Sequence, residues 1–132
     1  MKNLLEYEEF LFEFVSHRDL DSVERYADKL FKVIGVDIEF TKHFFDRVND
    51  ARNGKDISTS ELIDLFRRTY NQYGEQIASM KDEIEAVIFD TKSDINIPFV
   101  INVDSKGQLD LVSKTIMRKH DFKTYTKKLN IK

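Results

Sequence analysis

The chain has 132 residues, of which 41% are hydrophobic and 34% are charged, and it contains no cysteine. This composition is too apolar for a disordered protein, and the lack of cysteine excludes disulfides, thiolate nucleophiles and cysteine-based zinc sites. No apolar stretch approaches the roughly 20 residues of a membrane-spanning helix, and no secretory signal pattern is present. We therefore expect a single domain over residues 1–132 that stays in the cytoplasm.

The net charge of −3 is unevenly distributed. Residues 1–13 carry one lysine and four glutamates, whereas residues 114–132 carry seven Lys or Arg and one Asp. A basic end on a mildly acidic chain suits an anionic partner, although such a run is also typical of a solvated terminus.

Two helices are predicted in the first quarter of the chain. Residues 3–16 place apolar side chains near helical spacing with glutamates between them, which predicts an acidic amphipathic leader helix over residues 1–16. Asp21 forms a capping pattern with Glu24 and opens the second helix, which Gly35 ends.

Two more helices follow a brief extended stretch over residues 36–40. Thr41 opens the third helix, which extends to residue 48, and the turn-forming residues 49–54 predict a loop. A capping box at Ser58 opens the fourth helix, and Gly74 closes it.

The hydrophobic period then changes toward two. Residues 85–90 form a short apolar run, and residues 95–103 alternate as a strand. A turn over residues 104–107 joins that strand to a second one over residues 109–118, so the two should form a hairpin. Pro98 lacks an N–H, which favours an edge position or a bulge.

These elements predict an α+β fold, with about four N-terminal helices followed by a small antiparallel sheet of three to four strands. The basic tail over residues 119–132 has little to bury, although Phe122 is able to dock.

Several basic side chains and one histidine are predicted to lie close together in the fold. His43 and Arg47 lie four apart and should leave the same face of the third helix. If this helix lies across the sheet, a cationic site forms from His43, Arg47, Arg52, Lys114 and Arg118.

Such a site suits a phosphodiester, because arginine binds phosphate oxygens in pairs and histidine moves a proton near neutral pH. In metal-free RNA cleavage the ribose 2′-hydroxyl attacks its own phosphate, and the protein supplies a base, an acid and positive charge. The alternative is structural: His43 pairs with Asp46 or Asp50, and Arg47 forms a salt bridge.

Other chemistry has less support. No pair of histidines lies at metal-ligand spacing and no calcium-loop or phosphate-binding glycine pattern occurs, so neither a metal nor a cofactor is expected. The aromatic residues mostly lie at core spacing, with Tyr125 in the basic tail as the one candidate for base stacking.

Four segments carry a resemblance to a known family. Residues 41–50 (TKHFFDRVND), the pair Arg52-Asn53, residues 95–102 (INIPFVIN) and residues 111–122 (LVSKTIMRKHDF) resemble a family of small uncharacterised proteins of large contractile-tailed phages, including cyanophages. The resemblance covers roughly residues 20–124 and implies no particular activity.

A looser likeness concerns arrangement. A His-x-x-x-Arg helix followed by a helix and antiparallel strands, the last bearing a threonine, resembles the RelE- and BrnT-like metal-free ribonucleases. That resemblance implies these catalytic positions: His43, Arg47, Arg52 and Arg118. The substrate-binding positions that accompany them are Asn53, Lys114, Thr115, Lys119 and His120.

The leader offers a further resemblance. Residues 1–13 (MKNLLEYEEFLFE) are similar to the capsid-targeting sequences of phage internal head proteins, and Leu11-Phe12-Glu13 fits the prohead protease site. An ordinary amphipathic first helix explains the same residues.

Two functions therefore stay open. The first is a phage-encoded metal-free endoribonuclease or RNA-binding module acting on host or phage RNA in the host cytoplasm. The second is a non-enzymatic protein that binds a host protein or is packaged in the virion head. Neither involves a membrane, and the apolar residues of the first helix favour self-association or a partner.

Overall fold

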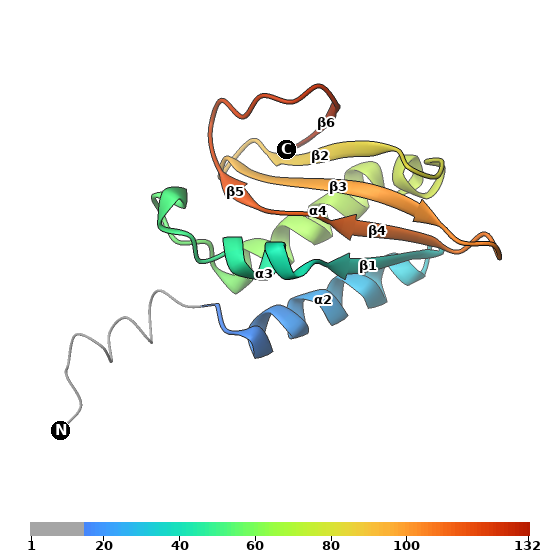
Figure 1. Ribbon diagram of the computed structural model, residues 1–132, viewed down its shortest axis with the longest axis horizontal. Coiled ribbons are helices and arrows are strands. Elements are labelled where there is room, and N and C mark those ends of the chain that lie inside the picture. Colours follow the sequence, from blue (N-terminus) through green and yellow to red (C-terminus); the bar gives the residue numbers. More distant parts are fainter. Residues whose placement is uncertain (1–14) are drawn as a thin grey trace.

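A computed structural model describes residues 15–132 as helices packed on one twisted sheet (Figure 1). The helices are α2 (His17–Lys32), α3 (Lys42–Arg47), the 3₁₀ turn η1 (Ala51–Asn53) and α4 (Thr59–Ala78). The strands are β1 (Val36–Phe40), β2 (Glu85–Asp90), β3 (Ile95–Val103), β4 (Leu109–Ser113), β5 (Met117–Arg118) and β6 (Lys127–Ile131).

The sheet is mixed, with the strand order β1-β4-β3-β2-β6 and the short β5 paired with β3. The central pairs β2–β3 and β3–β4 are antiparallel, whereas β1–β4 and β2–β6 are parallel. The prediction of about four helices followed by a small antiparallel sheet of three to four strands is therefore wrong. Residues 15–132 contain three α-helices and a six-stranded sheet, and β1 lies between the helices in the chain.

One face of the sheet carries the core. Along β3, Ile95, Ile97, Phe99 and Ile101 are all fully buried, because alternate side chains of a strand point to the same face. The helices α2 and α4 pack against each other, α2 also packs on β1, and α4 extends to β6. The opposite face carries neither of these two helices.

The edge strand β1 is protected by α2. Glu24 accepts a hydrogen bond from the N–H of Phe40 at 2.6 Å, and Asp28 accepts one from the N–H of Ile38 at 2.9 Å. Burial raises the pKa of Glu24, with the N–H of Phe40 acting in the opposite direction. These carboxylates occupy donors that an unprotected edge offers to a second sheet.

Several helix boundaries differ from those predicted. Helix α2 begins earlier, because Ser16 and Asp19 form its capping box instead of Asp21. Thr41 and Ser58 cap α3 and α4 as predicted. Gly74 does not end α4: it is buried, and a Cβ there would lie 3.4 Å from Ile34 Cδ1. A Cβ at this position would thus meet the side chain of Ile34, which follows α2, at ordinary contact distance.

The tail buries more than predicted. Leu129 and Ile131 are fully buried, and their strand β6 pairs with β2 in parallel. The alternation of apolar and polar residues in β6 covers only five residues, which is too few to distinguish a strand from a solvated tail in the sequence. Residues 3–14 of the predicted first helix, and the proposed protease site, lie outside the described residues.

Candidate functional site

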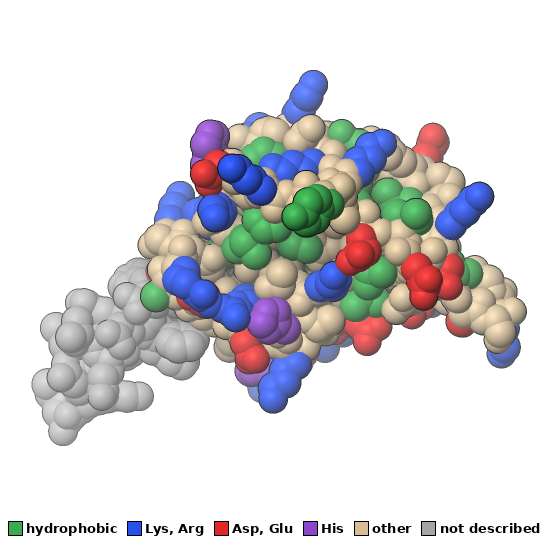
Figure 2. Space-filling view, turned by 45° about the horizontal axis from the view of Figure 1, so that its top comes forward, with side chains coloured by type: hydrophobic (Ala, Val, Ile, Leu, Met, Phe, Trp, Pro, Cys, Tyr) green, Lys and Arg blue, Asp and Glu red, His purple; other side chains and the backbone are tan. Residues whose placement is uncertain are grey.

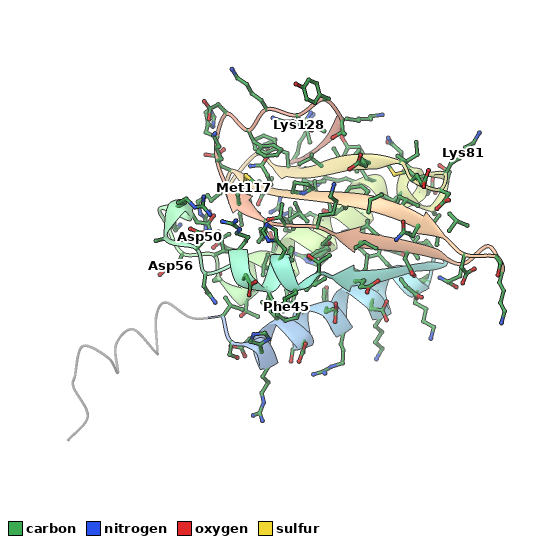
Figure 3. All side chains as sticks on the ribbon, viewed as in Figure 1. Phe45, Asp50, Asp56, Lys81, Met117 and Lys128 are labelled. Atoms are coloured by element: carbon green, nitrogen blue, oxygen red, sulfur yellow. The ribbon has the colours of Figure 1, made fainter. Side chains whose placement is uncertain are left out.

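A cleft of about 560 Å³ lies where the carboxyl end of β1 meets α3, η1 and β5. Asp50 and Met117, labelled in Figure 3, both line it at the same end of the sheet. The lining residues are His43, Arg47, Asp50, Arg52, Asn53, Thr115, Ile116, Met117, Arg118 and Lys119.

The cleft exists because the predicted last strand is interrupted. β4 stops at Ser113 and β5 starts at Met117, so residues 114–116 leave the ladder. Pro98 of β3 lies opposite this break, and its carbonyl accepts from the N–H of Lys114 at 2.9 Å. In an antiparallel pair, the N–H and C=O of one residue point to the same neighbouring strand. Proline has no N–H, and at Pro98 that group would point to the break between β4 and β5, where no ladder hydrogen bond is needed. Pro98 is thus central in the sheet, not on an edge. It lies at a bulge instead, the second of the two predicted positions, because residues 114–116 face only Ile97 and Pro98 between the pairs Ser113–Phe99 and Met117–Asn96.

Two polar side chains hold the walls in place. The hydroxyl of Thr41 donates to the carbonyl of Lys114 at 2.8 Å. Buried Asn53 donates from Nδ2 to the carbonyls of Arg47 and Val48, and its Oδ1 accepts from the N–H of Arg118 at 3.0 Å. Asn53, a predicted ligand-binding residue, therefore connects α3 to β5.

A chain of polar contacts crosses the cleft. Arg47 Nε donates to His43 Nε2 at 3.3 Å, and Arg47 Nη1 donates to Asp50 at 2.9 Å. Arg52 donates to the same carboxylate from Nη2 at 2.8 Å. Asp50 therefore holds two guanidinium groups, which leaves this part of the cleft positively charged. The side chains of Arg47 and Arg52 are 34% and 74% exposed, so a ligand is able to reach both.

The contacts of His43 and Arg47 agree in part with the predicted cationic site and in part with the structural alternative. The salt bridge of Arg47 is present, as the structural alternative expected, but its partner is Asp50, and His43 contacts Arg47 instead of Asp46 or Asp50. Asp50 was not among the predicted site residues. Its position three residues after Arg47 and two before Arg52 is the signal that identifies it.

Arg118 has a different role from the predicted one. Its guanidinium donates to the carbonyls of Lys55, Ser93 and Asp56 at 2.8 to 3.0 Å and to the carboxylate of Glu61 at 3.0 Å. Every guanidinium nitrogen thus has a protein acceptor, and the side chain is only 10% exposed. Burial acts to raise the pKa of Glu61, but hydrogen bonds from Arg118 and Ser58 lower it overall. Arg118 therefore connects the loop before α4, the turn between β2 and β3, and α4 itself, and has no nitrogen left for a phosphate.

The remaining predicted residues divide between the cleft and the surface outside it. Thr115 and Lys119 line the cleft. Lys114 instead pairs with Glu85 at 2.6 Å, and His120 pairs with Asp94 at 3.0 Å. The structure thus brings together His43, Arg47, Arg52, Asn53, Thr115, Arg118 and Lys119 and leaves Lys114 and His120 outside the lining.

Over residues 15–132, no group of three or more His, Asp or Glu side chains is arranged to hold a metal ion. Within the same part of the chain, no helix combines the length and the apolar character needed to cross a membrane. No known protein family, curated protein or solved structure matches this chain.

Proposed function

We propose that this protein binds RNA by its phosphate in the cleft and cleaves it without a metal ion. The observation that carries the proposal is the arrangement of His43, Arg47, Arg52 and Lys119 around one cleft with a single carboxylate, Asp50. Arginine forks match phosphate oxygens, and a histidine in hydrogen-bond reach is able to move the proton.

The reaction needs one bond to form and one to break. The ribose 2′-oxygen bonds to phosphorus, its proton passes to His43 Nε2, and the bond to the 5′-oxygen breaks. Water that enters the open cleft supplies the proton for the leaving 5′-oxygen. The products are a 2′,3′-cyclic phosphate and a 5′-hydroxyl end, with the guanidinium groups of Arg47 and Arg52 offsetting charge on the phosphate.

Arg47 connects binding to chemistry. Its Nε always carries hydrogen, so the nitrogen of His43 that it contacts is an unprotonated acceptor. When Arg47 turns to a phosphate oxygen, His43 Nε2 becomes free to accept the 2′-hydroxyl proton. The same arginine thus shields the base in the free protein and binds the substrate.

The test is cleavage of a mixed RNA pool in excess chelator by wild type, His43→Ala and Arg47→Ala proteins, with His120→Ala as the matched control. Loss of an acid–base group costs about 100-fold or more, so His43→Ala should lose activity by that factor. His120→Ala should cleave like wild type, because His120 lies outside the cleft lining. Wild-type cleavage should leave 2′,3′-cyclic ends.

Two outcomes overturn the cleavage proposal. One is a wild-type protein as inert as His43→Ala across pH and salt, and the other is cleavage that the chelator abolishes. The first result favours the alternative of a non-enzymatic interaction protein, and the second replaces metal-free cleavage with metal-dependent cleavage.

A further inference from the structure

The segment that follows the cleft residue Lys119 is basic. Residues 119–132 contain five lysines and one aspartate. Within residues 15–132, Lys119, Lys123, Lys127 and Lys128 form no ion pair with a carboxylate. Figure 2 shows basic side chains gathered on the left and upper part of this face, while acidic side chains concentrate to the right. The basic area is therefore open to an anionic ligand.

Tyr125 lies within this segment and is fully exposed, at 109% of its reference accessibility. Among the Phe and Tyr side chains of residues 15–132 it is the only exposed one, since the others are buried or half-buried. A solvated tyrosine ring without packing partners is able to stack on another flat ring.

The base of the segment is fixed to the sheet. Asn96, buried in β3, donates from Nδ2 to the carbonyl of Lys119 at 2.9 Å, and the N–H of Lys119 donates to the carbonyl of Asp94 at 2.8 Å. Further along, Lys128 lies over the rings of Phe89 and Phe122 at 4.9 and 5.9 Å from their centroids. Figure 3 places Lys128 beside this loop. Tyr125 therefore lies between Lys119 and Lys128, both of which contact the sheet or residues packed on it.

We propose that Lys119, Lys123 and Lys127, together with Tyr125, form a second RNA contact, in which Tyr125 stacks on an unpaired base of a strand whose phosphate occupies the cleft. This inference rests on the proposed function and narrows its ligand to single-stranded RNA. Lys119 belongs to both surfaces, and Tyr125 lies six positions after it, which is at most about 21 Å of extended chain. At about 3.4 Å per nucleotide, a ten-nucleotide strand is long enough to reach both.

The chemistry favours a single strand over a duplex or an acidic protein. Lysines alone attract any polyanion, but the exposed ring adds a contact that only a flat, unstacked group satisfies. Bases in a duplex already stack on their neighbours, so they cannot cover Tyr125 without unpairing.

The experiment measures binding of a labelled ten-nucleotide 2′-O-methyl RNA, which lacks the attacking hydroxyl, to wild type, Tyr125→Ala, Tyr125→Phe and Arg47→Ala proteins. A stacked base is worth about 1–3 kcal/mol, so Tyr125→Ala should weaken binding about tenfold or more. Tyr125→Phe keeps the ring and should bind like wild type. A strand with abasic sites should bind wild type and Tyr125→Ala equally, and a duplex should show no effect of either Tyr125 substitution.

The outcomes separate the two proposals. Equal binding by Tyr125→Ala and wild type, with weaker binding by Arg47→Ala, overturns the stacking contact and leaves the cleft proposal standing. Weaker binding by Tyr125→Ala with unchanged binding by Arg47→Ala supports the stacking contact and overturns the cleft as the phosphate site. A protein that binds no strand overturns both.

Discussion

Two pairs of arginines in this protein have opposite environments. The side chains of Arg68 and Arg118 are 14% and 10% exposed, whereas those of Arg47 and Arg52 are 34% and 74% exposed. The first pair bonds to acceptors from several elements, among them the buried carboxylate of Asp90, and the second pair shares the carboxylate of Asp50. The comparison indicates that the buried pair stabilises the fold and that the exposed pair is available to a ligand.

The largest effect is expected at Arg68. It donates from two nitrogens to Asp90, which is 2% exposed, so Arg68→Ala leaves a carboxylate buried without its cation. The expected loss in the free energy of unfolding is about 3–5 kcal/mol, measured by urea denaturation. The matched variant is Arg67→Ala, whose salt bridge with Asp64 is exposed and is worth about 1 kcal/mol or less. Equal losses in both variants would contradict the comparison.

The same variant changes the acid dependence of stability. Burial acts to raise the pKa of Asp90, but donors from Arg68, Ser93 and Lys92 lower it below its ordinary 3.8. Its contribution to stability is present above that value and is lost as the pH falls through the lowered pKa. Arg68→Ala removes the strongest donor and keeps the burial, so its stability should begin to fall at a higher pH than that of wild type. Urea midpoints between about pH 7 and pH 3 measure the difference.

Arg118 should follow with a smaller loss. Its replacement by alanine leaves the partly buried carbonyl of Ser93 and the carboxylate of Glu61 without this donor, whereas water is able to reach the exposed carbonyls of Lys55 and Asp56. Because an unsatisfied buried group costs about 1–3 kcal/mol, we expect a loss of about 2 kcal/mol in the free energy of unfolding. Arg52→Ala should lose less than about 1 kcal/mol and should weaken RNA binding instead. An Arg118→Ala protein that is as stable as wild type but has lost RNA binding would reassign Arg118 to the ligand site.

Contacts between residues close together in the sequence were predictable, whereas contacts between distant residues were not. The caps at Thr41 and Ser58, and the contact between His43 and Arg47, join residues three or four apart, and spacing alone indicates them. The parallel pairing of β6 with β2 joins residues about 40 positions apart, and nothing in either segment names its partner.

The structural role of Arg118 could not be predicted from the sequence either, because its partners are distant in the chain. Three of its acceptors are main-chain carbonyls, 25 to 63 residues away, and a carbonyl has no residue type that identifies it. A basic residue beside a predicted site therefore looks the same in sequence whether it binds a ligand or holds loops together. Only the hydrogen-bond partners of Arg118 separate the two.

The smallest effect is expected at the exposed pair of His120 and Asp94. The hydrogen bond from the imidazole to Asp94 raises the pKa of His120 above its ordinary 6.5. The stabilising effect of the pair is therefore fully present below that value and is lost as the pH rises through the raised pKa. An NMR titration should show His120 titrating above 6.5, and Asp94→Asn should return it toward that value.

Asp94→Asn is a suitable substitution because residue 94 has φ = 64°, a left-handed conformation that asparagine adopts readily. The pH dependence of RNA cleavage should be the same in this variant as in wild type, because His120 lies outside the cleft lining. A cleavage profile that moves together with the pKa of His120 would instead make His120, not His43, the group that transfers the proton. In that case the basic segment would be part of the reaction site.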